Sequence, residues 1–164
     1  MGENRLKKLP PQIGQLVALK TLHLMDNQIS EIPSQISQLK LLEALYLNCN
    51  QIGELPPEVG QLKALPQLSL DKNRLENLPP EFFHLTTLKS LHLDGNQLKE
   101  LDPKIGQFIA LKSLSLNHNQ IEGLPPTIGK LKALESLFLT GNPIAELPDE
   151  ITELEALKEF VFER

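Results

Sequence analysis

Residues 19–41 read LKTLHLMDNQISEIPSQISQLKL, and this stretch of 23 residues contains the pattern that decides the fold. Eight of its positions are apolar or asparagine and form a template: Leu19, Leu22, Leu24, Asn27, Ile29, Ile32, Ile36 and Leu39. Six copies of the template, each shifted by 23 residues, cover 48 positions between residues 19 and 156, and all 48 carry an apolar residue or the expected asparagine. A chain that is 40% apolar does not produce this match by chance, so the sequence is a tandem repeat.

The repeat runs through the whole chain, and no linker interrupts it. Six full repeats occupy residues 19–156. Residues 1–18 correspond to the second half of a repeat, and residues 157–164 correspond to the first half of another. We therefore predict a single repeat domain over residues 1–164.

Each repeat begins with residues that alternate between apolar and polar, as in Thr21-Leu22-His23-Leu24. This alternation predicts a short strand with one buried face. Eleven of the 13 prolines follow the later Ile or Leu of the repeat, where their fixed φ suits a turn. The next residues, such as residues 58–62, are too few for a lasting α-helix and predict about one or two turns of 3₁₀ helix.

A unit of this size cannot bury enough apolar surface to fold alone, so neighbouring units must stack into a solenoid with one parallel sheet. The asparagines recur every 23 residues, at Asn4, Asn27, Asn50, Asn73, Asn96, Asn119 and Asn142. A carboxamide turned inwards can bond backbone groups of successive coils, and leaving such groups unpaired costs about 1–3 kcal/mol per site. We therefore predict an asparagine ladder along the solenoid.

The pattern LxxLxLxxNxLxxLPxxIxxL at this period resembles the leucine-rich repeat of the intracellular and bacterial class. Phrases such as Asn27-Gln28-Ile29 and Asn119-Gln120-Ile121 are similar to leucine-rich repeat proteins of leptospires, and the same period resembles Ras-scaffold and Ras-suppressor proteins. The resemblance implies an α/β fold class: a right-handed horseshoe with a parallel concave sheet and short 3₁₀ or helical turns on the convex side. It also implies protein binding without an activity of its own.

The chain departs from the family pattern at four places. Asp102 replaces the first proline of its turn, Pro66 removes a backbone donor at a strand start, and Pro143 follows a ladder asparagine. Neither end carries the polar or cysteine-rich cap of many family members, so the outer coils would expose apolar side chains and a strand edge. Three readings stay open: charged residues such as Lys7 and Lys8 blunt the ends, the chain is part of a longer protein, or copies associate end to end as a homo-oligomer.

The residues beside the strand leucines are expected to point away from the core and to form columns with one member per coil. We predict that this concave face binds a protein partner through His23, Met25, Tyr46, Asn48, Ser69, Asp71, His92, Asp94, Ser115, Asn117 and Phe138. Tyr46 and Phe138 are the expected anchors, because aromatic side chains dominate binding hot spots. The acidic and amide residues between them favour a basic or amide-rich partner. The alternative is a solvated sheet face with two incidental aromatic residues.

Charge and hydropathy argue against two classes of partner. The 16 Lys and Arg against 21 Asp and Glu give a net charge of −5, and the lysines are scattered, so we expect no nucleic-acid partner. No apolar run approaches the roughly 20 residues that cross a bilayer, and the first residues lack the apolar stretch of an export signal. We therefore expect no membrane insertion, and the compartment is left open between the cytoplasm and export from a bacterium.

The sequence offers no catalytic or metal-binding constellation. His92, Asp94 and Asp71 could meet on adjacent coils, but no phosphate-binding or nucleophile motif accompanies them. Cys49 is the single cysteine, so the chain has no internal disulfide, and we interpret it as a partly buried small side chain. We predict no cofactor, no metal and no enzymatic activity. Three functions remain: a protein-binding scaffold, which we favour, a self-assembling structural element, and the recognition arm of a larger effector or ligase-type protein.

Overall fold

The computed structural model of the protein describes residues 4–163, so residues 1–3 and Arg164 of the predicted domain lie outside the described residues. Strands of three residues alternate with 3₁₀ turns of five residues. The strands are β1 (Thr21–His23), β2 (Ala44–Tyr46), β3 (Gln67–Ser69), β4 (Ser90–His92), β5 (Ser113–Ser115), β6 (Ser136–Phe138) and β7 (Glu159–Val161). The turns are η1 (Pro11–Gln15), η2 (Ser34–Gln38), η3 (Pro57–Gln61), η4 (Pro80–His84), η5 (Pro103–Gln107), η6 (Pro126–Lys130) and η7 (Asp149–Glu153).

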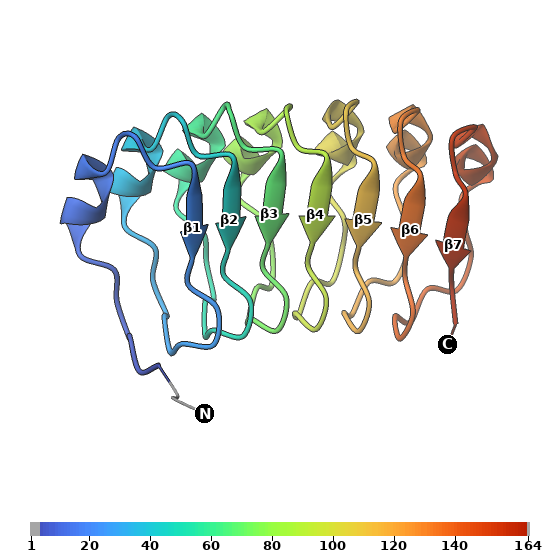
Figure 1. Ribbon diagram of the computed structural model, residues 1–164. Helices are drawn as coiled ribbons and strands as arrows, with labels where there is room; N and C mark the ends of the chain where they lie inside the picture. The colour runs from blue at the N-terminus through green and yellow to red at the C-terminus, as the bar shows by residue number, and fades with distance from the viewer. Residues whose placement is uncertain (1–3, 164) are drawn as a thin grey trace.

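The strands form one parallel sheet in the order β1-β2-β3-β4-β5-β6-β7. Neighbouring strands pair residues that are one repeat apart, as in Leu22 with Leu45 and Leu45 with Leu68. Figure 1 shows the strands in one row and the turns in a second row that spreads more widely, so the sheet lies on the inner side of the curve. The predicted solenoid, with its parallel concave sheet and short 3₁₀ turns, is confirmed. We call the side of the sheet that points away from the leucine core the concave face.

The core lies between the sheet and the row of turns. The strand residues Leu68, Leu91 and Leu114 and the turn residues Ile36 and Ile105 are all at most 2% exposed. Burying such a side chain stabilises the fold by about 1.5–3 kcal/mol, and this gain requires the neighbouring coils to be stacked.

The prolines begin the turns at the predicted places. In η3, Pro56 is extended, with φ −67 and ψ 143, and Pro57 occupies the first helical position, where no backbone donor is needed. The turn ends when the backbone N–H of Leu62 donates to the carbonyl of Val59 at 3.1 Å. Asp102 stands where the other six turns have proline, and its carboxylate accepts a hydrogen bond from the backbone N–H of Lys104 at 2.7 Å. A side-chain cap therefore replaces the rigid residue at η5.

The asparagine ladder is confirmed from Asn27 to Asn142. The Oδ1 atom of Asn96 accepts from the backbone N–H of Leu75 in the preceding coil at 3.1 Å. Its Nδ2 atom donates to the carbonyls of Leu70 and Leu93, both at 3.0 Å. Equivalent bonds surround Asn50, Asn73, Asn119 and Asn142, which are 4–8% exposed. The ladder fixes each loop against the loop before it.

Candidate protein-binding surface

An aromatic platform covers the first strands of the concave face. The rings of His23 and Tyr46 stack with centroids 4.7 Å apart and an interplanar angle of 11°. The hydroxyl of Tyr46 donates to Oε1 of Gln67 at 2.7 Å. The register pairs His23 with Tyr46, and Gln67, which pairs with Ala44, lies diagonally across from Tyr46 on β3. The platform is therefore held in one orientation before any partner arrives.

Phe138 lies on the other half of the concave face. It is the last residue of β6 and pairs with Ser115 of β5 and Val161 of β7. Its side chain is half-buried, as is that of Tyr46. Four coils separate the two aromatic residues, or roughly 19 Å at the usual strand spacing. The structure thus brings the two expected anchors onto one face, each one strand in from an end of the sheet.

Two residues of the predicted binding set are buried. Ser69 is 6% exposed and Ser115 is 4% exposed. The hydroxyl of Ser69 donates to Oδ2 of Asp71 at 3.1 Å, and that of Ser115 donates to Oδ1 of Asp94 at 2.6 Å. The two serines therefore hold the carboxylates that fold over them, and little of either side chain is open to a partner.

A second ladder runs along the edge where the strands end. The Oδ1 atom of Asp71 accepts from the backbone N–H of Asp94 at 2.9 Å, and Oδ1 of Asp94 accepts from the N–H of Asn117 at 2.8 Å. The Oδ1 atom of Asn117 in turn accepts from the N–H of Thr140 at 2.8 Å. We did not predict this ladder from the sequence. The signal for it was the run of short polar acceptors in one column, which we interpreted as a partner-binding strip.

Burial raises the pKa of the Asp71 carboxyl above its ordinary value. The hydrogen bond from the Asp94 backbone acts in the opposite direction, and the nearby Asp94 carboxylate raises the pKa further. Beside it, Asn48 donates through Nδ2 to Oδ2 of Asp71 at 3.3 Å, while its own buried Oδ1 atom has no hydrogen-bond partner among residues 4–163. Most hydrogen bonds of Asp71 and Asp94 are therefore made to groups of the chain itself.

The imidazole of His92 does not join the carboxylates in a metal site. Its Nε2 atom lies 2.8 Å from the hydroxyl of Ser90 on the same strand. Within residues 4–163, no group of three or more His, Cys, Asp or Glu side chains is placed to hold a metal ion. Met25 is 38% exposed at the edge of the face, next to the exposed His23.

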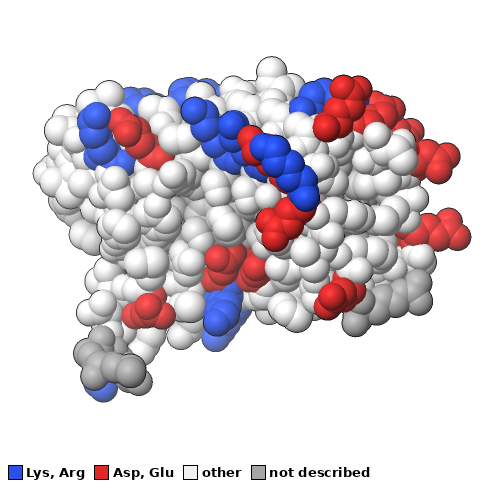
Figure 2. Space-filling view, turned by 45° about the vertical axis from the view of Figure 1, so that its right-hand side comes forward, with Lys and Arg blue, Asp and Glu red and all other residues white. Residues whose placement is uncertain are grey.

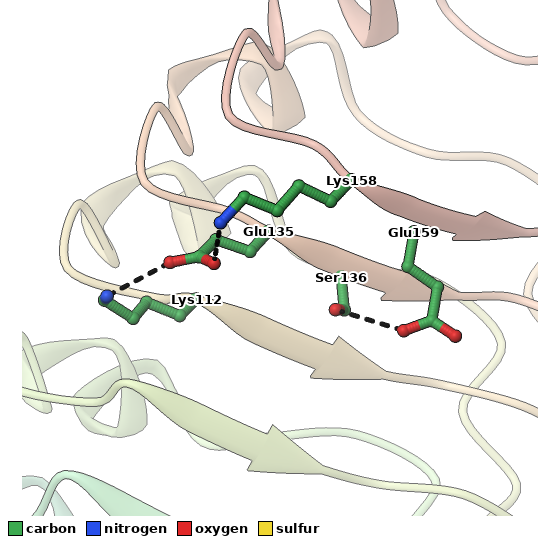
Figure 3. Close-up of polar contacts among 5 residues, drawn as sticks. All are labelled: Lys112, Glu135, Ser136, Lys158 and Glu159. Carbon is green, nitrogen blue, oxygen red and sulfur yellow. Dashed lines mark hydrogen bonds and ion pairs between the residues drawn. The ribbon is translucent and has the colours of Figure 1, made fainter.

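Charged side chains border the edge where the strands begin. Glu135 lies between two lysines, with its carboxylate 3.0 Å from Nζ of Lys112 and 2.6 Å from Nζ of Lys158 (Figure 3). Hydrogen bonds from Lys158 and Lys112 lower the pKa of Glu135 below its ordinary value. On β6 the hydroxyl of Ser136 donates to Glu159 at 3.4 Å. Figure 2 shows most charged residues in an upper band that descends at the centre of the view and a smaller group below it, with uncharged surface to either side.

Cys49 lies in the loop after β2 in a left-handed conformation, with φ 55. Its side chain is partly buried, as predicted. Burial and the neighbouring Asp26 carboxylate raise the pKa of the thiol. A raised pKa favours the thiol over the thiolate, which is the reactive form.

The helical elements of residues 4–163 are all short 3₁₀ turns, and none has the length and apolar character needed to span a membrane.

A family model described as leucine rich repeat matches residues 2–52, 40–98, 63–121 and 86–144. Among solved structures, a leucine-rich repeat protein of Leptospira interrogans is 36% identical with a TM-score of 0.79, and the match covers 98% of this chain and 49% of that one. TLR13, solved in a complex with ssRNA13, is 31% identical with a TM-score of 0.85, over 96% of this chain and 23% of that one. The functional domain of InlJ from Listeria monocytogenes, which includes a cysteine ladder, is 25% identical with a TM-score of 0.81. That match covers 94% of this chain and 31% of the InlJ chain.

The chain spans about half the length of the Leptospira protein and smaller shares of the other two. No curated protein matches it at a significant level. The Leptospira structure agrees with the leptospiral resemblance of the repeat phrases and suggests a bacterial protein. The family matches, the repeat period and the asparagine ladder lead to one conclusion: the chain belongs to the leucine-rich repeat family.

Proposed function

We propose that the chain is a non-catalytic scaffold whose concave face binds a protein partner. Leucine-rich repeat proteins are generally protein-interaction scaffolds and generally lack enzymatic activity. The observation that carries the proposal is the middle column of the concave face, His23 to Val161 at steps of 23 residues, which contains no Lys, Arg, Asp or Glu and holds Tyr46 and Phe138 half-buried. Aromatic side chains in such a setting supply a large apolar contact area and are typical binding hot spots.

Rigidity supports the same proposal. The asparagine ladder ties neighbouring coils together, and the second ladder joins the coils of β3 to β6. The stack of His23 on Tyr46 is made within the chain. Binding to an ordered surface costs less conformational entropy than binding to a flexible one. Seven strands at the usual spacing offer a sheet roughly 29 Å long, which accommodates a helix, a hairpin or a loop of a partner.

Charge favours a partner that is apolar in the middle and basic or amide-bearing at one side. The middle column of the concave face contains no Lys, Arg, Asp or Glu, while Asp71 and Asp94 mark the edge where the strands end. TLR13 was solved with a single-stranded RNA, but the net charge of −5 of this chain argues against a phosphate backbone as its partner.

The test begins with affinity capture from bacterial and host lysates, followed by purification of the captured protein. Its affinity is then measured for the native chain, for Tyr46→Ala with Phe138→Ala, and for Leu41→Ala with Ile109→Ala. The last pair is a matched control, because Leu41 and Ile109 are 52% and 68% exposed beyond the ends of the turns, away from the concave face. We expect the concave pair to weaken binding by at least about tenfold and the control pair by less than twofold. Equal effects of the two pairs would contradict the proposal.

A second candidate is end-to-end association of two copies. Leu16, on the first coil of the described residues, is 52% exposed, and Phe160 on β7 is 41% exposed. The same template positions in inner coils are covered by the next coil, as at Leu39 and Leu45. Light scattering across a concentration series tests this candidate. A mass that rises with concentration for the native chain, but remains that of a monomer for Leu16→Lys with Phe160→Lys, supports this candidate. A constant monomer mass for the native chain contradicts it.

A further inference from the structure

One column of the 3₁₀ turns carries a small residue in every coil except one. The small members are Gly14, Ser37, Gly60, Gly106, Gly129 and Thr152. The fourth member, in η4, is Phe83. Its side chain is fully buried, so it fills space inside the solenoid.

The small residues are needed because neighbouring turns touch there. A Cβ atom on Gly106 would lie 2.9 Å from the carbonyl oxygen of Thr127, and one on Gly129 would lie 2.8 Å from the carbonyl oxygen of Glu150. A Cβ on Gly60 would overlap the carbonyl oxygen of Glu81. At these junctions the next coil leaves no room for a side chain.

Phe83 requires the next turn to stand further away. Of the six neighbouring pairs of turns, η4 and η5 approach each other least closely (Figure 1). An aromatic cluster fills the space: Phe83 stacks on Phe108 with centroids 5.7 Å apart, and Phe82 contacts both rings edge-on at 5.8 and 5.9 Å. A pocket of about 60 Å³ lies beside the cluster, lined by Asn77, Leu78, Phe83, Glu100, Leu101 and Asp102.

The sheet side of the same junction keeps its normal spacing. The backbone N–H of Leu93 donates to the carbonyl of Ser115 at 2.9 Å. One coil earlier, the backbone N–H of Leu70 donates to the carbonyl of His92 at the same distance. β4 and β5 pair in the same register as the other strands. The junction is therefore wider at the turns and unchanged at the sheet, which bends the solenoid more sharply between β4 and β5.

We infer that Phe83 is a positioning residue for the concave face: its side chain wedges η4 from η5 and turns the strands that carry Tyr46 towards those that carry Phe138. The two anchors lie on β2 and β6, on either side of the bend. That this bend helps Tyr46 and Phe138 to contact one partner rests on the proposed function. The bend itself can be measured without any partner, so the two ideas fail separately.

The test measures spacing with nitroxide labels on pairs of introduced cysteines, in a Cys49→Ser background. His84→Cys with Gln107→Cys spans η4 and η5, and Gln107→Cys with Lys130→Cys spans η5 and η6 as the matched control. All three positions are exposed. In the native chain we expect the first pair to be further apart than the second. Equal separations would overturn the inference at once.

The second arm restores the residues of the other coils, with Phe83→Gly and Phe108→Leu together. We expect the label separation across η4 and η5 to shorten to that across η5 and η6, which itself stays unchanged. A third pair, Thr21→Cys with Glu159→Cys on the outermost strands, should move apart as the bend relaxes. Unchanged label separations in the folded variant would show that Phe83 fills the core without holding η4 and η5 apart, and would overturn the inference. If the double variant does not fold, Phe83→Leu must give an intermediate spacing, and an unchanged spacing there overturns it too.

Discussion

Asn96→Ala removes one rung of the asparagine ladder in the middle of the solenoid. Among the described residues, the Oδ1 atom of Asn96 is the hydrogen-bond partner of the backbone N–H of Leu75, at 3.1 Å. Leu75 is 0% exposed, so water does not replace the lost acceptor in the folded state. A buried donor without a partner costs about 1–3 kcal/mol of stability.

The two short bonds that Nδ2 of Asn96 donates are lost at a lower cost. The carbonyl of Leu70 still accepts from Nδ2 of Asn73 at 2.9 Å, and the carbonyl of Leu93 still accepts from Nδ2 of Asn119 at 2.9 Å. Each lost bond then contributes about 0.5 kcal/mol, at the low end for a neutral hydrogen bond. The total expected loss for Asn96→Ala is about 2–4 kcal/mol.

Thermal unfolding followed by circular dichroism measures this loss. For a chain of this size, 1 kcal/mol lowers Tm by about 2–4 °C, so we expect a decrease of roughly 4–16 °C. The matched control is Gln97→Ala, because Gln97 is exposed and adjacent in sequence. Its effect should stay within about 0.5 kcal/mol.

The position of the rung provides a second check. Asn27 lies on an outer coil and is only half-buried, and its Oδ1 atom accepts from the exposed Leu6 at 3.1 Å. Asn27→Ala should therefore destabilise less than Asn96→Ala, because water reaches the groups it leaves behind. Equal melting temperatures for Asn96→Ala and Gln97→Ala would refute the ladder as a source of stability.

Three further predictions use other features of the coils. Gly60→Ala should destabilise by about 1–3 kcal/mol, because the new Cβ would overlap the carbonyl oxygen of Glu81, whereas the Cβ of Gly53→Ala would meet open space and leave the urea midpoint unchanged. Asp71→Asn keeps an acceptor for the N–H of Asp94 and removes a partly buried charge, so at pH 7 it should be at least as stable as the native chain. Because the folded pKa of Asp71 is raised, this group makes the native chain more stable as pH falls from the folded to the unfolded pKa, and Asp71→Asn should lose that dependence. By NMR, the carboxyl of Glu135 should titrate with a pKa below its ordinary value, and its small contribution to stability should be lost as pH falls through this lowered pKa. Lys112→Ala with Lys158→Ala should raise the pKa of Glu135.

The 23-residue period could predict the fold because the same apolar, proline and asparagine positions recur in every coil. A buried leucine, a turn proline and an inward asparagine have the same surroundings in every coil, so one repeat describes them all. The sheet register, the 3₁₀ turns and the asparagine ladder follow from this, and all three are confirmed. The face that presents Tyr46 and Phe138 was predictable for the same reason, while its role in binding stays a prediction.

What the tertiary structure decided depends on contacts between unlike residues of different coils. The sequence places Ser69 and Ser115 in the same column as Tyr46, but the carboxylates of Asp71 and Asp94 fold over the serines and bury them. The bend at Phe83 likewise arises because a single large side chain meets the backbone of the next turn. The period alone determined which residues face inwards, since every coil repeats it; the shape and chemistry of the outer face were settled only when neighbouring coils packed, because those contacts differ from coil to coil.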